Sequence, residues 1–93
     1  MQVLALEPDA AESYDLLGWL YFAADVPALA EGNLLRALEL DPNYAATHLH
    51  LGMLYLKTGD FNKARYHLQR AESLASATPI GETAARLLAE YFP

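Results

Sequence analysis

A chain of 93 residues that is 54% hydrophobic and 11% aromatic has the size of one small globular domain, and it is too apolar to be intrinsically disordered. The absence of cysteine excludes disulfides and thiolate metal sites, and a net charge of −6 without a basic stripe argues against nucleic acids and anionic membranes as partners. No apolar run is long enough for a transmembrane helix, and MQVLALEPDA lacks the features of a signal peptide. The default expectation is a cytoplasmic protein, although a truncated start would hide an export signal.

Charge divides unevenly between the two halves of the chain. Residues 1–41 contain eight acidic residues and one basic residue, which gives −7, whereas residues 42–93 contain four acidic and five basic residues, which gives +1. The two values sum to the stated −6. The plainest interpretation is that these charges lie on solvated helix faces.

Residues 11–24 and 27–40 are predicted to form the first complete helices, after residues 1–10, which match only the tail of a helix. Each has apolar or small residues at helical spacing, and DPN ends the second. Between them, Asp25 is able to cap the second helix and Pro27 suits its first turn. The stripes are Tyr14, Leu17, Gly18 and Tyr21 in the first helix, and Ala30, Leu34, Ala37 and Leu38 in the second.

Residues 45–57 and 61–76 are predicted to form a second pair of the same kind. The turn TGD between them supplies Gly59, which adopts a positive φ readily, and Asp60, which is positioned as an N-cap. After Leu74 the expected Asp-Pro is missing, so the second helix of this pair is predicted to continue to residue 76.

Residues 80–92 are predicted to form a last helix, with Pro79 near its start. Its apolar residues fall on one face and its charged residues on the other, which indicates a final packing helix of the kind that ends a repeat array. The apolar stripe is Ile80, Ala84, Leu87, Leu88 and Tyr91, and the residues facing away are Glu82, Arg86 and Glu90.

The chain repeats itself at an interval of 34 residues. When residues 11–44 are aligned with residues 45–78, ten pairs are identical, and most are apolar or small. One pair is Gly18 and Gly52, which lie within helices, where glycine costs roughly 1 kcal/mol relative to alanine. A glycine at both positions predicts that two helices cross closely there. The residues predicted to face the glycines are Ala30 and Ala64.

The repeated unit resembles the tetratricopeptide repeat, whose pattern is W-x2-L-G-x2-Y, then A-x3-F, then A and P. RALELDPNYA is also close to the usual end of a unit in this family. The sequence departs from the pattern at His48, Asp25 and Ser76, and the missing proline at Ser76 indicates that the regular array ends there. The residues at the pattern positions are Tyr14, Leu17, Gly18, Tyr21, Ala30, Leu34, Ala37 and Pro42 in the first unit, and His48, Leu51, Gly52, Tyr55, Ala64, Leu68 and Ala71 in the second.

This resemblance implies an all-α fold, namely a right-handed superhelix of antiparallel helix pairs with a C-terminal capping helix. The expected parts are the tail of a preceding repeat helix at 1–10, one unit at 11–44, a second unit at 45–78 and the capping helix at 79–93.

The resemblance also implies a concave groove, lined by the first helix of each unit, that binds a peptide or protein segment. Some chaperone-binding members grip a terminal carboxylate with Lys and Asn, but Asp15 and Trp19 stand at those positions here, so that specificity is not expected. An aromatic and aliphatic strip with an acidic rim suits a hydrophobic or amphipathic segment with basic flanks. The predicted groove residues are Glu12, Asp15, Trp19, Phe22, Leu49, His50, Met53 and Leu56.

Trp19 is the sharpest candidate for a partner contact, because tryptophan is enriched among interface hot spots, although it is equally suited to fill space against a neighbouring helix. Phe22 and Met53 are further candidates with the same two interpretations. The tyrosines of the packing stripes are predicted to be core residues instead. They are Tyr14, Tyr21 and Tyr55.

No catalytic, metal or cofactor site is predicted. His48 and His50 are two residues apart and therefore on different helix faces, and His67 belongs to the following helix, so the i, i+4 metal-binding pair is absent. The sequence also lacks the nucleophile-elbow, phosphate-loop and zinc-protease motifs. His48 is expected to pack, and His50 to lie at the groove edge.

Two hypotheses of function remain open at this stage. The first is an adaptor or scaffold module that binds a protein segment. The second is a structural unit that forms a homodimer or part of a larger solenoid, since about three repeats are usually needed for stability. The apolar MQVLAL then docks on another copy, or on an upstream helix if the chain is part of a longer protein.

Overall fold

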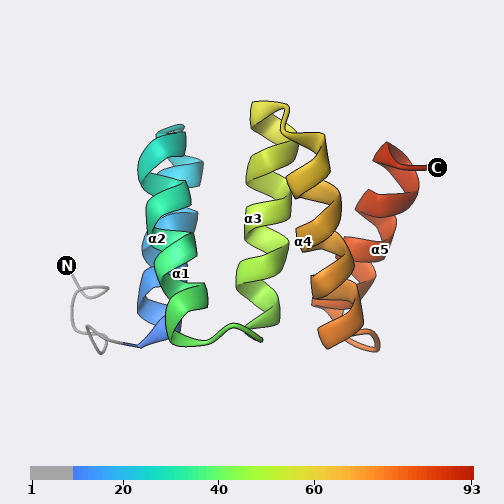
Figure 1. The fold of residues 1–93 in the computed structure, drawn as a ribbon, viewed down its shortest axis with the longest axis horizontal. Helices are drawn as coiled ribbons and strands as arrows, with labels where there is room; N and C mark the ends of the chain where they lie inside the picture. Colours follow the sequence, from blue (N-terminus) through green and yellow to red (C-terminus); the bar gives the residue numbers. More distant parts are fainter. Residues whose placement is uncertain (1–9) are drawn as a thin grey trace. The chain divides into compact units, whose positions relative to one another are not determined.

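The computed structural model describes residues 10–93, which form five α-helices joined by short turns (Figure 1). The described residues contain no strand, so the all-α prediction is confirmed. The predicted helix tail at residues 1–10 lies almost wholly outside the described residues. The helices are α1 (Ala11–Ala23), α2 (Pro27–Leu40), α3 (Ala45–Thr58), α4 (Phe61–Leu74) and α5 (Pro79–Tyr91).

The chain divides into two compact units, the first ending at Tyr44 and the second running from Ala45 to Pro93. In the first unit, α1 and α2 pack against each other as a helical hairpin. In the second unit, α3 and α4 form the equivalent hairpin, and α5 packs mainly on α4 with a smaller contact on α3. Each unit therefore has its own packed interior.

Within each hairpin the two helices cross closely at the repeated glycine, as the sequence predicted. A Cβ atom built on Gly18 would lie 2.5 Å from Leu34 Cγ, and one built on Gly52 would lie 2.6 Å from Leu68 Cδ2. Leu34 and Leu68 are completely buried, so neither has room to move aside. The prediction named the alanine of the second helix as the facing residue. The Ala30 carbonyl oxygen does lie 3.2 Å from the Cβ position of Gly18, but the nearest atoms at both glycines belong to the leucine one helical turn later, whose longer side chain reaches the gap that glycine leaves.

The turns within the two hairpins use different residues in the same backbone conformation. Gly59 follows α3 with φ of 88°, and Asp25 follows α1 with φ of 63°. Asp25 was predicted to cap α2, but Val26 occupies the N-cap position and no side chain caps that helix. Asp25 instead terminates α1, since the backbone N–H groups of Asp25 and Val26 donate to the carbonyls of Phe22 and Tyr21. Asp60 caps α4 as predicted, accepting a hydrogen bond from the Lys63 N–H.

Helix α4 ends at Leu74 rather than at the predicted residue 76. The cause is the start of α5. Thr78 must be extended because it precedes a proline, and its hydroxyl bonds the Ala75 carbonyl at 2.7 Å while accepting from the Gly81 N–H at 3.3 Å. Gly81 is required here, because a Cβ atom would meet the Ala75 carbonyl oxygen. The short turn brings α5 back against α4.

The apolar residues of α5 close the core of the second unit. Leu49, Leu68, Ala71 and Ala84 form a buried cluster. Tyr91 was predicted to join this packing face, but it is exposed. Phe92 packs there instead, because it lies just beyond the helix end and its backbone is free to turn the ring inward. The partly buried residues around the cluster are Met53, Leu56, Ile80, Leu87, Leu88 and Phe92.

Candidate functional site

Helix α1 carries an aromatic pair formed by Trp19 and Phe22. Their ring centroids are 5.2 Å apart and the rings are tilted by 51°, a geometry that aromatic pairs favour. Both side chains are partly buried and keep part of their surface in solvent, and the neighbouring Leu20 is exposed. Trp19 is the single tryptophan of the chain. The pair combines a large apolar area with a fixed orientation, which are the properties of an interface anchor.

The acidic residues predicted beside this pair differ in exposure. Glu12 is exposed in the first turn of α1, whereas Asp15, one turn later, is 7% exposed and buried. The pKa of Tyr44 is raised, mainly by burial and further by the negative charges of Asp15, Glu12 and Asp41. The carboxylates at the start of α1 and after α2 are thus close enough to Tyr44 to raise the pKa of its phenol. They give this end of the first unit a negative potential.

The predicted groove residues of α3 have a partner within their own unit. Leu49 is 7% exposed and belongs to the buried cluster beneath α5. Met53 and Leu56 are partly buried and pack against the same cluster. His50 is partly buried. The apolar row of α3 is therefore largely engaged by the last helix, so the α1 pair is left as the stronger candidate surface.

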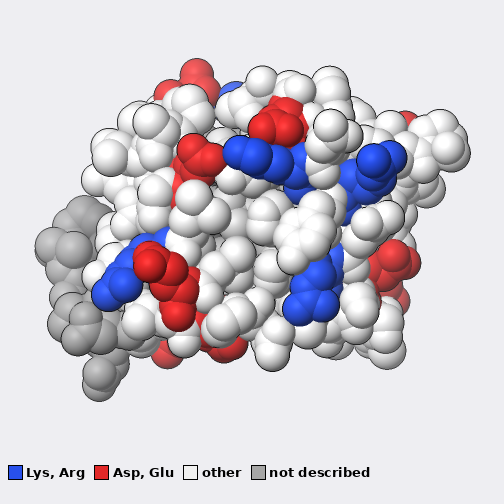
Figure 2. All heavy atoms as spheres, viewed as in Figure 1, with Lys and Arg blue, Asp and Glu red and all other residues white. Residues whose placement is uncertain are grey.

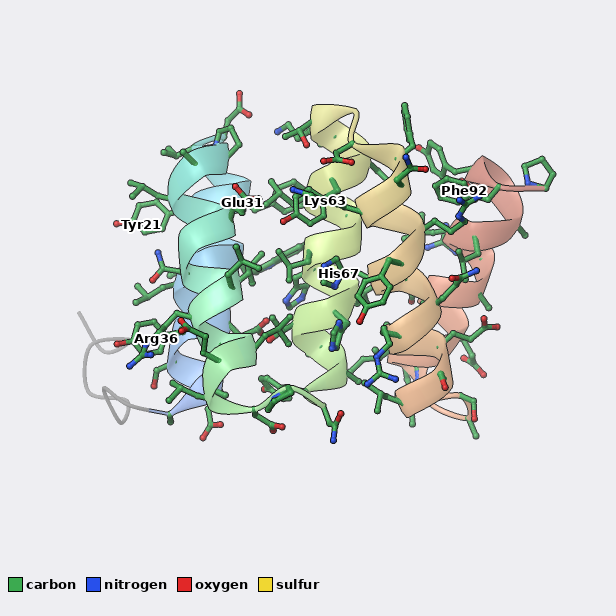
Figure 3. All side chains as sticks on the ribbon, in the orientation of Figure 1. Tyr21, Glu31, Arg36, Lys63, His67 and Phe92 are labelled. Atoms are coloured by element: carbon green, nitrogen blue, oxygen red, sulfur yellow. The ribbon has the colours of Figure 1, made fainter. Side chains whose placement is uncertain are left out.

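The three tyrosines predicted to be core residues also differ in burial between the two units. Tyr55 is buried as predicted, but Tyr14 and Tyr21 are only partly buried. The Arg36 guanidinium lies 5.7 Å from the centroid of the Tyr14 ring and also pairs with Glu39 at 3.7 Å. Figure 3 shows Tyr21 and Arg36 on one side of the first hairpin. Tyr14 and Tyr21 are therefore partly exposed to solvent rather than enclosed in a core.

A histidine pair that the sequence analysis did not identify joins α3 to α4. The Nδ1 atoms of His48 and His67 are 3.0 Å apart, so one ring donates a hydrogen bond and the other accepts it. His67 also stacks on Tyr55, with ring centroids 5.7 Å apart (Figure 3). The pKa of His67 is lowered from 6.5 to about 4, chiefly by burial and then by the neighbouring charges of His48 and Lys63. The His67 ring therefore remains neutral at physiological pH.

One signal in the sequence points to this pair. His48 precedes and His67 follows the turn between two antiparallel helices, so the hairpin is able to bring them together. His48 is 3% exposed, which agrees with the expectation that it packs. Residues 10–93 contain no group of three or more potential metal ligands around it. Nor does any helix in this part of the chain have the length and hydropathy needed to cross a bilayer.

Comparison with known proteins identifies the repeat. Residues 33–66, from the middle of α2 into α4, match the family model described as tetratricopeptide repeat. A relative, the uncharacterized protein ycf37 of Porphyra purpurea, is 32% identical over 73 residues, which are 78% of this chain and 42% of that protein. The chain thus spans about two fifths of the length of this relative. The tetratricopeptide repeat is a non-enzymatic helical repeat fold that generally serves to bind proteins or peptides.

Proposed function

Because this chain contains a tetratricopeptide repeat, we propose that it is an adaptor or scaffold module that binds a segment of a partner protein and catalyses no reaction. The fold class alone is compatible with many binding functions, so the proposal depends on a particular surface. That surface is the aromatic pair on α1, which consists of Trp19 and Phe22.

The observation that supports this choice is the unequal coverage of equivalent residues. Trp19 and Phe22 occupy the repeat positions that Met53 and Leu56 hold in the second unit. In the second unit these positions pack against the cluster closed by α5, whereas the described residues of the first unit, 10–44, contain no helix that corresponds to α5. Both aromatic rings keep solvent-exposed area and are held in place by their mutual contact. A partner segment that covers them gains apolar contact while little side-chain freedom is lost.

The charges near α1 define the chemistry of the partner. The first unit has one basic residue, Arg36, and its guanidinium already pairs with Glu39. Glu12 is exposed at the start of α1. A segment with an apolar centre and Lys or Arg flanks is therefore attracted to this surface, and an acidic segment is repelled.

The test begins with peptides selected from a random display library against the full chain. Affinity is then measured by fluorescence anisotropy of labelled peptides, and Trp19 emission independently reports contact in the parent protein. Trp19→Ala is expected to weaken binding at least about tenfold, and Phe22→Ala severalfold. Tyr91→Ala is the matched control, because this exposed aromatic residue lies on α5. A Trp19→Ala variant that binds the selected peptides as tightly as the parent would contradict the proposal.

Self-association is the second candidate function, and the exposed apolar residues of α2 favour it. Leu29 is 50% exposed and Leu35 is 42% exposed, so both offer apolar surface that a second copy could cover. If this helix joins two copies, light scattering over a hundredfold dilution gives a dimer mass that Leu29→Lys with Leu35→Lys reduces to the monomer mass. A constant monomer mass in the parent excludes this candidate.

A further inference from the structure

We propose that the outer face of α4 is a second binding surface, separate from the aromatic pair of α1, and that it takes an acidic segment of a partner protein. The face consists of Lys63, Arg65, Tyr66 and Arg70. This inference goes beyond the proposed function, because it assigns a different surface to a partner of opposite charge.

The packing of α4 turns these residues outward. Ala64, Leu68 and Ala71 form the completely buried stripe of the helix, at i, i+4 and i+7. Lys63, Tyr66 and Arg70 repeat at i, i+3 and i+7 and therefore form a second row along the helix. Figure 2 shows Lys and Arg side chains gathered over α4. The buried stripe and the basic row are on different faces, so a partner is able to reach the row without opening the core.

The Arg65 guanidinium is oriented by aromatic rings rather than by a carboxylate. It lies 5.7 Å from the centroid of the Phe92 ring, and Phe61 packs against Phe92 with ring centroids 6.5 Å apart (Phe92 is labelled in Figure 3). Among the described residues, Arg65 has no ion pair with any carboxylate. A guanidinium that rests on a ring keeps its N–H donors available, so Arg65 is able to bind a carboxylate in the bidentate geometry.

Lys63 is held in a similar way. Its ammonium lies 5.4 Å from the centroid of the Tyr55 ring and pairs with the Asp60 carboxylate at 3.6 Å. Both side chains of that ion pair are substantially exposed, so the pair contributes little and an incoming carboxylate competes with Asp60 easily. Figure 3 labels Lys63 over α3, beside the upper part of α4. Lys63 and Arg65 thus lie on opposite flanks of the outer face, one supported by Tyr55 of α3 and the other by Phe92 after α5, because residues i and i+2 of a helix do not face each other.

Tyr66 adds an apolar contact among these cations. It is 55% exposed, and its ring meets His67 edge-on with centroids 5.0 Å apart. Its orientation is therefore fixed before a partner binds, which reduces the entropy lost in binding. A partner that combines carboxylates with an apolar side chain uses both the charges and this ring.

The distribution of charge favours an acidic protein segment over a nucleic acid or an anionic membrane. The second unit has five basic and four acidic residues, whereas the rest of the chain carries −7. A short acidic segment is able to stay within about one Debye length, roughly 8 Å, of the basic face. An extended polyanion is repelled by the net charge of −6 on the chain.

The test uses the full chain and a fluorescein-labelled peptide of about twelve residues in which Glu alternates with Leu, with anisotropy as the readout. Arg65→Gln is expected to weaken binding by about fivefold or more, Lys63→Gln by a similar factor, and Tyr66→Ala by about threefold. Arg86→Gln is the control for charge, because it removes one exposed cation from α5, where Arg86 pairs with Glu90. It should change the affinity less than about twofold. Raising NaCl from about 50 to 500 mM should also weaken binding.

Two further measurements separate this surface from the α1 pair and from a folding defect. Trp19→Ala should leave the affinity for the acidic peptide unchanged, so failure of one proposal does not imply failure of the other. Thermal melting followed by circular dichroism checks that each variant is folded. If Arg65→Gln loosens the packing of Phe92 and lowers the stability, Lys63→Gln tests the same surface without that defect.

Several results would overturn the inference. One is equal binding of the peptide with Gln in place of Glu. Another is an equal loss in Arg86→Gln, which shows a response to net charge alone. Absence of any binding of the acidic peptide at a protein concentration of about 1 mM would also overturn the inference. A dimer that Arg65→Gln dissociates assigns the face to a second copy, and tight binding of duplex DNA that Arg65→Gln removes assigns it to nucleic acid.

Discussion

The two hairpins use the same helix crossing and differ in what surrounds it. In each, a glycine of the first helix admits a completely buried leucine of the second, Leu34 in one unit and Leu68 in the other. At another aligned pair of positions, the second hairpin has the His48–His67 hydrogen bond where the first has Tyr14 and Asn33. The crossing tolerates no change because no space is left, whereas the neighbouring positions accept different side chains as long as each finds a partner.

The same comparison explains where binding surfaces arise. Trp19 and Phe22 stay partly exposed on α1, while the residues at equivalent positions of α3 pack against the cluster that α5 closes. A row that packs against the cluster of its own unit contributes stability, and a row that stays partly exposed is the one we propose for partner binding. Under that proposal, equivalent residues of the repeat have different roles, depending on which helix follows them.

The largest effect on the free energy of unfolding is expected at the crossing glycines, where the two hairpins are most alike. Gly18→Ala and Gly52→Ala should each destabilise the protein by about 1–3 kcal/mol, because the new methyl group overlaps a buried leucine. Gly32→Ala on α2 is the control, since nothing lies within 4 Å of its Cβ position, and it should stabilise by about 0.5–1 kcal/mol. Urea unfolding monitored by circular dichroism measures all three. Equal stability of the two crossing variants and the parent would contradict the close-packing argument.

The next effect distinguishes the hairpins by their response to acid. The pKa of His67 is about 4 in the folded protein and 6.5 in the unfolded chain, so the unfolded chain binds the extra proton. The stability that the neutral His67 ring contributes is fully present above pH 6.5 and is lost as the pH falls from 6.5 through about 4. His67→Asn, which introduces the residue found at position 33, should flatten the pH dependence over that interval.

Unfolding free energies at pH 7.5 and pH 5 measure the acid effect. In the parent, stability should fall between these two values of pH. The fall should be smaller in His67→Asn, while Asn33→Ala in the other hairpin should leave it unchanged. A parent and a His67→Asn variant with the same slope would show that the histidine pair does not couple to folding.

The smallest effect concerns the turns. Asp25 and Gly59 share the left-handed conformation, which glycine adopts without strain. Asp25→Gly should therefore stabilise the first hairpin by about 1 kcal/mol, and Gly59→Asp should destabilise the second by a similar amount. Thermal melting of both variants tests this. If the two substitutions shift the melting temperature in the same direction, a local contact of Asp25 outweighs its backbone strain.

Much of the fold was predictable because its signals are local. Helical spacing placed all five helices within about two residues of their observed bounds. The errors occurred where the next segment or the next residue decided the outcome. Helix α4 ends early because Thr78 and Pro79 start the next helix, and Tyr91 is exposed because Phe92 takes the place against the core.

The candidate site was predictable only in part. The repeat pattern identified the residues of the first helices, including Trp19 and Phe22, but it assigned equal exposure to both units. It did not indicate that Leu49 is buried beneath α5, or that His48 meets His67 across the hairpin. It also gave no reason to single out the outer face of α4, where the aromatic support of Arg65 comes from Phe92 at the other end of the unit.

The sequence by itself determined the interval of 34 residues, the helix type of each segment and the positions that must be small, because these depend on spacing and side-chain volume along a single helix. The tertiary structure decided which apolar row is covered, which histidines are hydrogen-bonded to each other and which cations lie on aromatic rings. These properties depend on residues far apart in the chain, whose proximity exists only after the helices have packed.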